Sequence, residues 1–101
     1  MTELELVAEL EYLMRKFGAD GPSFASIILS GENAALPHGH PSMRKIEHGD
    51  FVLIYMGVIK DGYCSDITRT FIVGEATEIQ REIYDTVLAS TLAGIKAAKA
   101  N

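Results

Sequence analysis

Cysteine is almost absent from the sequence, which contains Cys64 and no other thiol. A single cysteine excludes an internal disulfide and a zinc site built from several thiolates. A nucleophilic cysteine needs a neighbouring base, and no Cys/His signature surrounds Cys64, so we interpret it as an ordinary strand residue. We therefore expect a protein of the reducing cytoplasm.

An excess of basic residues and a long apolar run are also missing. The nine Lys and Arg are scattered among fourteen acidic residues, and the net charge is −5. Because phosphate binding needs a basic patch, we expect no nucleic-acid partner. The longest apolar run, at 51–59, is far shorter than the roughly 20 residues that span a bilayer, so we expect no membrane association.

The composition that remains is typical of a globular domain. The chain is 48% hydrophobic and 23% charged over 101 residues. A domain commonly needs about 100–150 residues, so this length predicts one domain that spans residues 1–101. No repeat, low-complexity tract or linker divides it.

Local signals predict an α+β fold. Thr2 with Glu5, and Thr77 with Gln80, have the capping-box spacing that begins a helix. The predicted order is a helix at 3–17, a strand at 24–30, a long loop at 31–49, hairpin strands at 51–59 and 63–73, and a long helix after Thr77. We expect an antiparallel sheet with the helices on one face, and a further layer to cover its other apolar face.

The hairpin brings two polar side chains together. An Asp-Gly pair at 61–62 predicts a two-residue turn, which places Tyr55 opposite Thr68. Asp66 then lies diagonally from Tyr55 on the same side of the sheet, roughly 7–8 Å away between strands. At that distance two side chains can converge on one ion or a pair of ions.

Several segments carry a family resemblance over essentially the whole chain. The most specific is Ser65-Asp66-Ile67-Thr68-Arg69-Thr70, within the segment 49–71, and it is supported by Glu11-Tyr12-Leu13, Gly18-Ala19, Pro22-Ser23-Phe24, Ser30-Gly31 and Leu36-Pro37-His38-Gly39. The chain resembles the N-terminal half of a pita-bread metallopeptidase, the superfamily of prolidases (X-Pro dipeptidases), aminopeptidases and creatinases. The resemblance implies half of the pita-bread fold.

The resemblance also implies a metal site that is incomplete here. Enzymes of this family hold two divalent ions with two aspartates of the hairpin and with a histidine and two glutamates of the second half. Asp66 matches one aspartate, Tyr55 occupies the position of the other, and we expect the remaining ligands to lie beyond Asn101. With four of five ligands missing, we expect Asp66 to be vestigial and the isolated chain to be no enzyme. Alternatively, Asp66 only accepts hydrogen bonds from hydroxyls such as that of Thr68.

Because four of the five metal ligands are missing, we expect this chain to bind no cofactor by itself. Mn, Co or Zn would bind only if another chain completed the site. His38 matches a family histidine that contacts substrate, although we assign no catalytic residue. His38 and His40 could together hold a transition ion, or could be exposed loop residues. The glutamates near the N-terminus, namely Glu3, Glu5, Glu9 and Glu11, are expected to form an exposed helix face.

Three functions remain open. The first is an isolated or engineered half-fold that is inactive alone and forms a homodimer through the surface that the missing half would cover. Tyr55 would suit such a dimer, because it avoids a cluster of unpaired carboxylates near the axis. The second is a residual metal-dependent dipeptidase or aminopeptidase that a second chain completes. The third is a binding module without catalysis.

Overall fold

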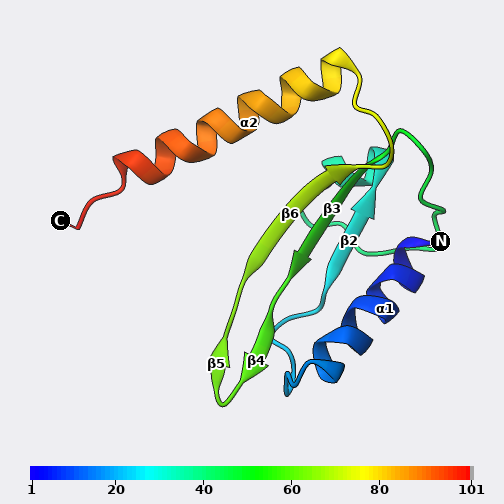
Figure 1. Cartoon of the computed structure of the whole chain (residues 1–101), viewed down its shortest axis with the longest axis vertical. Coiled ribbons are helices and arrows are strands. Elements are labelled where there is room, and N and C mark those ends of the chain that lie inside the picture. The colour runs from blue at the N-terminus through cyan, green and yellow to red at the C-terminus, as the bar shows by residue number, and fades with distance from the viewer. Residues whose placement is uncertain (101) are drawn as a thin grey trace.

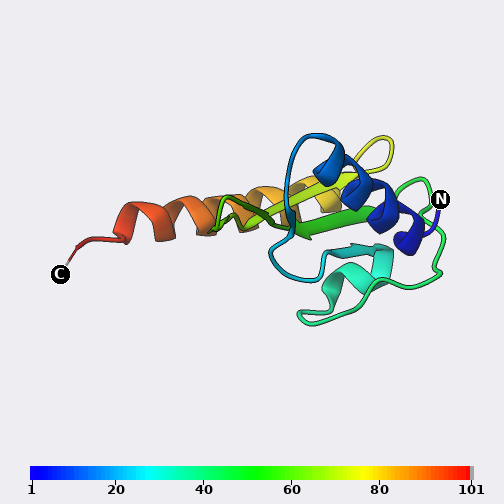
Figure 2. The same ribbon diagram turned by 90° about the horizontal axis from the view of Figure 1, so that it is seen from below.

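The computed structural model describes residues 1–100, and Asn101 lies outside the described part. The elements are α1 (Glu3–Lys16), β1 (Gly21–Pro22), β2 (Ile27–Ser30), a 3₁₀ helix η1 (Gly31–Ala35), β3 (Phe51–Met56), β4 (Val58–Lys60), β5 (Tyr63–Cys64), β6 (Ile67–Ile72) and α2 (Glu78–Ala97). Figures 1 and 2 show α1 beside the strands and α2 projecting away from them. The predicted α+β class and order of the main elements are confirmed.

The first helix begins and ends where the sequence signals predict. Thr2 and Glu5 form the reciprocal capping box, with Thr2 Oγ1 accepting from the Glu5 N–H at 3.1 Å. After the cap at Phe17, Gly18 has φ +99°, a left-handed conformation that favours glycine and ends the helix. The inner side of α1 packs on β1 and β2, where Met14 is buried.

The hairpin has the predicted register but belongs to two sheets. Tyr55 pairs with Thr68 in the sheet β2-β3-β6, and Lys60 pairs with Tyr63 in the sheet β1-β4-β5. The strands are interrupted at Gly57, where a Cβ would collide with the carbonyl of Ser65. The expectation of a single sheet is therefore wrong. The two hairpin strands approach each other closely at Gly57 and Ser65, and both are interrupted there, so the hairpin is divided between two sheets.

Residues 21–30 also differ from the expectation. The Asp-Gly-Pro segment predicts a turn, but Gly21 and Pro22 form β1, which pairs antiparallel with β4. The second strand is shorter than predicted and begins at Ile27. Proline has no N–H and cannot donate a hydrogen bond to a neighbouring strand. Pro22 fits in β1 because β1 is an edge strand, which has a neighbour on one side only.

The second helix extends away from the sheet. Its capping box at Thr77 and Gln80 forms as predicted, and Gln80 Nε2 also donates to the carbonyl of Gly49 at 2.7 Å. No residue of α2 is buried within residues 1–100, and of the two α-helices α1 is the one that packs extensively on strands, namely β1 and β2. The expectation that both helices cover one sheet face is thus met by α1 alone (Figure 1). Neither helix within residues 1–100 is long and apolar enough to cross a membrane.

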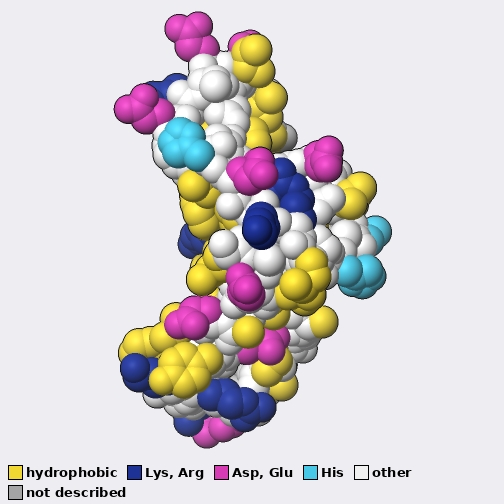
Figure 3. Space-filling view, turned by 90° about the vertical axis from the view of Figure 1, so that its right-hand side faces the viewer, with side chains coloured by type: hydrophobic (Ala, Val, Ile, Leu, Met, Phe, Trp, Pro, Cys, Tyr) yellow, Lys and Arg dark blue, Asp and Glu magenta, His cyan; other side chains and the backbone are white. Residues whose placement is uncertain are grey.

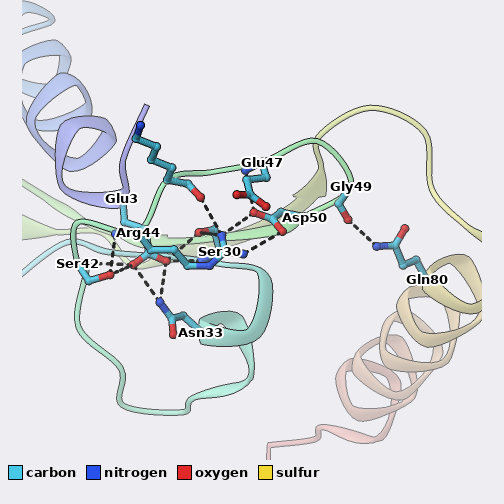
Figure 4. A network of polar contacts seen from close by, with 10 residues as sticks. Glu3, Ser30, Asn33, Ser42, Arg44, Glu47, Gly49, Asp50 and Gln80 are labelled. Carbon is cyan, nitrogen blue, oxygen red and sulfur yellow. Dashed lines mark hydrogen bonds and ion pairs between the residues drawn. The ribbon is translucent and has the colours of Figure 1, made fainter.

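A small apolar core encloses one carboxylate. Ile28, Leu29 and Val52 are buried in β2 and β3, and Glu3 at the start of α1 has a relative exposure of 0%. The Glu3 oxygens accept from the N–H and hydroxyl of Ser30 at 2.6 and 2.9 Å and from those of Ser42 at 3.0 and 2.8 Å (Figure 4). The expectation of an exposed Glu3 is wrong, because four donors from distant segments compensate its burial.

The same network continues into the loop before β3. Arg44 Nη1 donates to Ser30 Oγ at 2.9 Å and to Asp50 Oδ2 at 2.6 Å, the latter an ion pair. The hydrogen bond from Arg44 lowers the pKa of Asp50 below its ordinary value. Figure 4 shows how these contacts join α1, β2, η1 and the long loop around one point.

The buried carboxylate predicts a specific acid sensitivity. Burial alone raises the pKa of Glu3, but hydrogen bonds from Ser42 and Ser30 outweigh it and hold the pKa below the ordinary 4.5. Because the folded-state pKa is the lower one, the stabilisation is complete above pH 4.5 and is lost as the pH falls through the folded-state value. Urea unfolding of Glu3→Gln should show a loss of about 1–3 kcal/mol at neutral pH and a weaker dependence on acid.

Glu9→Gln is the matched control for this experiment, because Glu9 is an exposed glutamate of the same helix. It should unfold with a free energy close to that of the unchanged chain. Equal destabilisation by both substitutions would contradict the assigned role of the Glu3 network.

Candidate functional site

The predicted convergence of Tyr55 and Asp66 is confirmed. Tyr55 lies in β3, and Asp66 lies between β5 and β6, directly before the first residue of β6. The hairpin register brings them together, and Tyr55 Oη donates a hydrogen bond to Asp66 Oδ2 at 3.3 Å. The carboxylate itself is exposed.

An aromatic neighbour fixes the Tyr55 ring. Phe24, in the segment before β2, lies with its ring centroid 4.4 Å from that of Tyr55 at an interplanar angle of 31°. This contact is not among the features predicted from the sequence. The signal that could have revealed it is the antiparallel pairing of β2 with β3, which places Ile27 opposite Tyr55 and brings the preceding segment alongside.

The local charge keeps the phenol protonated. The negative charge of Asp66 raises the pKa of Tyr55 above 10.0, and desolvation and the hydrogen bond act in the same direction. A neutral phenol is a weak ligand for a hard divalent ion, and here its proton is directed at the one carboxylate. The pair is arranged as donor and acceptor rather than as two anionic ligands.

The residues present therefore do not fit a pair of divalent ions. A two-metal site needs several carboxylates or imidazoles that bridge and flank the ions. Within residues 1–100, no group of three or more His, Cys, Asp or Glu side chains is placed to hold a metal ion.

A shallow apolar hollow lies against the Tyr55 ring. It measures about 240 Å³, and its walls include Leu29, Leu36, Pro37, Leu53 and Tyr55. These side chains come from β2, β3 and the residues that follow η1. The Glu3 network fixes the same 3₁₀ segment through Asn33, whose Nδ2 lies 3.4 Å from the carboxylate, so it also shapes this hollow.

The histidines do not form a cluster with the hairpin. His38 and His40 are exposed in the long loop. Figure 3 shows imidazoles at the surface in two places, one at the upper left and the other at the right-hand edge. The ring of His48 lies against Gly74, where it leaves no room for a side chain. A substrate contact by His38 and a shared ion between His38 and His40 stay predictions.

The remaining candidates have local roles in the structure. Cys64 is exposed in β5, in agreement with its interpretation as a strand residue. Arg69 Nη1 donates to the carbonyl of Thr68 at 2.8 Å along β6. Neither residue contacts the Tyr55 and Asp66 pair through a hydrogen bond in the described part of the chain.

Comparison with known proteins identifies the family. The sequence profile of metallopeptidase family M24 matches residues 1–101. The chain belongs to this family. Among M24 relatives, it is 50% identical to the Xaa-Pro dipeptidase of Pyrococcus furiosus over 97 residues, which are 96% of this chain and 28% of that protein. The Xaa-Pro dipeptidase of Pyrococcus horikoshii is 47% identical, with the same coverage of both chains.

Solved structures of M24 relatives have the same fold in this region. An X-Pro aminopeptidase from Thermotoga maritima superposes with a TM-score of 0.96 at 44% identity, covering 99% of this chain and 28% of that one. The prolidase of Pyrococcus furiosus gives 0.83 at 50% identity, covering 88% and 26%. The fold is thus the N-terminal part of the pita-bread fold, and the chain spans about a quarter of the length of these relatives.

The pKa of Tyr55 provides a test of the pair. Asp66→Asn removes the charge that is the main cause of the raised value, so the Tyr55 phenol should ionise at a lower pH than in the unchanged chain. Phenolate absorbance followed by alkaline titration measures this shift, and Tyr55→Phe identifies which of the four tyrosine transitions belongs to this residue. Glu9→Gln, a charge removal in α1, should leave it unchanged.

Proposed function

We propose that this prolidase-like metallopeptidase region is inactive as a peptidase by itself and is able to associate with a second copy. The observation that carries the proposal is the Tyr55 and Asp66 pair. A phenol that donates to the carboxylate stands where the family resemblance expects a second aspartate. The chain belongs to the M24 family and covers 28% of the length of the Xaa-Pro dipeptidase of Pyrococcus furiosus.

Loss of peptidase activity follows from the chemistry of that pair. Metal-assisted hydrolysis needs ions that activate water and polarise the scissile carbonyl. One exposed carboxylate, engaged by a neutral phenol whose pKa is raised, does not fix such ions in a defined geometry. The retained scaffold therefore supports a structural role, and a cytoplasmic location remains a prediction from the sequence.

Self-association is supported by the apolar surface that the fold leaves uncovered. The large apolar side chains of α2 are exposed, and so are Phe71 of β6 and Tyr63 of β5. Exposed large apolar side chains that gather on one helix, as they do on α2, are typical of an interaction site. A homodimer would bury it with the symmetry that most homo-oligomers adopt.

A second candidate is a residual dipeptidase or aminopeptidase whose site another chain completes. It is favoured by the retained Asp66 and by the 50% identity to an Xaa-Pro dipeptidase. In that case the metal and the missing ligands would come together only in a complex.

Metal binding and turnover discriminate the two candidates. The purified chain with Mn²⁺, Co²⁺ or Zn²⁺ should hydrolyse no X-Pro dipeptide above the metal-only blank and should give no tight isotherm in calorimetric titration. Tyr55→Asp supplies the carboxylate that the family places there, so tighter metal binding by this variant would identify Tyr55 as the lost ligand position. Turnover by the unchanged chain would refute inactivity and favour the enzyme.

Light scattering tests the association. At micromolar concentration the chain should have about twice its mass of 11.0 kDa. A folded species at the mass of a single chain, with the expected helical circular dichroism, would reject self-association. A monomer would not decide whether the chain binds metal, because light scattering and calorimetric titration test different surfaces.

A further inference from the structure

The loop 31–41 leaves the sheet and returns to it at one point. Its flanking residues, Ser30 and Ser42, both bind the buried carboxylate of Glu3 (Figure 4). The N–H and hydroxyl of Ser30 donate to Oε2 at 2.6 and 2.9 Å, and those of Ser42 donate to Oε1 at 3.0 and 2.8 Å. A compact surface loop of about 6–16 residues whose ends lie together is an Ω-loop. One carboxylate therefore closes this loop at both ends.

Few other polar contacts attach the loop to the rest of the chain. Outside η1, its backbone hydrogen bonds are internal, from the N–H of Leu36 to the carbonyl of Asn33 at 3.0 Å and from the N–H of Gly39 to the carbonyl of Leu36 at 3.4 Å. Within residues 1–100, the side-chain hydrogen bonds from the loop to other segments come from Asn33 alone, and both reach Glu3 at 3.4 Å. The polar attachment of the loop thus converges on Glu3.

The loop covers one face of the sheet β2-β3-β6. Successive side chains of a strand point to opposite faces, so Leu29 and Leu53 lie on one face and Ile28 and Val52 on the other. Figure 2 shows α1 on one side of these strands and η1 on the other. The loop therefore covers the face that α1 leaves free.

The hollow beside Tyr55 lies under this loop. It measures about 240 Å³, and its walls are formed by Leu36 and Pro37 of the loop and by Leu29 and Tyr55 of the sheet, among others. The backbone of Gly39 lies against Leu29, since an added Cβ would stand 3.1 Å from Leu29 Cδ1. Leu29 is only 2% exposed, so lifting the loop would uncover this side chain and open the hollow.

Burial differs between the loop and the strands beneath it. None of the residues 31–41 is buried, whereas β2 and β3 contribute Ile28, Leu29 and Val52 to the core. Segments with few buried apolar contacts open locally at a lower free energy than core strands do. Once its bonds to Glu3 part, the loop can open while the sheet stays folded.

We propose that loop 31–41 is a lid over the hollow beside Tyr55, latched by the carboxylate of Glu3, and that it opens as a unit while the sheet remains folded. Glu3 is then a positioning residue, because it acts on the hollow through Ser42 and Asn33. The proposal goes beyond the function proposed above and does not depend on it, since opening of the loop requires neither a second copy nor a metal ion.

Thiol labelling tests whether the lid opens by itself. In a Cys64→Ser background, which removes the exposed native thiol, Leu29→Cys places a thiol under the loop, and Val52→Cys places one on the opposite face of the sheet. Both positions are buried, at 2% and 0% exposure, so Val52→Cys is the matched control. Iodoacetamide in the absence of denaturant should label Leu29→Cys at least about tenfold faster, after correction for the free energy of unfolding of each variant. Equal corrected rates would overturn the proposal.

Hydrogen exchange tests the latch. Ser42→Ala removes one hydroxyl from Glu3 at the loop end and keeps the bonds from Ser30 at the strand end. The amides of residues 36 and 42 should then exchange about tenfold faster, while the amides of β3 keep their rates.

Ser23→Ala is the matched control for the latch. It removes a serine hydroxyl that donates to the carbonyl of Ser65 at 2.9 Å, outside the loop, so the amides of residues 36 and 42 should keep their rates. Equal acceleration of loop and β3 amides in Ser42→Ala would show that the loop opens only with the sheet, and this result would reject the lid. The same loop acceleration in Ser23→Ala would reject the latch. Neither result would change the outcome of light scattering or metal titration, so failure of the lid is distinguishable from failure of the proposed function.

Discussion

The carboxylate of Glu3 connects segments that would otherwise share little apolar contact. It receives hydrogen bonds from Ser30 at the end of β2 and from Ser42 in the long loop, and Arg44 extends the network to Asp50 at the start of β3. The buried core is small, so these directed bonds define where the loop and η1 lie. Through η1 they also place the apolar walls beside Tyr55.

The hairpin site illustrates how one residue changes the chemistry of a retained geometry. The register that brings positions 55 and 66 together would serve two carboxylates equally well. Two unpaired carboxylates at this distance repel each other unless cations lie between them. Tyr55 replaces that repulsion with a hydrogen bond to Asp66 and adds an aromatic contact with Phe24, so the pair is satisfied without an ion.

Local signals were sufficient for much of the fold and for the candidate pair. Both capping boxes and the two-residue turn depend on neighbours in the sequence, and the hairpin register that follows correctly joined Tyr55 to Asp66. The burial of Glu3 was mispredicted because its donors lie up to 39 residues away and helical spacing alone makes it resemble Glu9. The break at Gly57 likewise depends on a backbone contact from the opposite strand. The direction of α2 after Gly74 has no signal in local spacing.

Assembly and catalysis place different demands on such a chain. Burial of the exposed apolar side chains of α2 is non-directional and tolerates many arrangements. A two-metal centre requires several ligands at fixed distances, and an arbitrary second surface does not supply them. Tyr55 adds no negative charge beside Asp66, and it gives Asp66 a hydrogen-bond donor. A surface that favours association therefore does not by itself supply a catalytic centre.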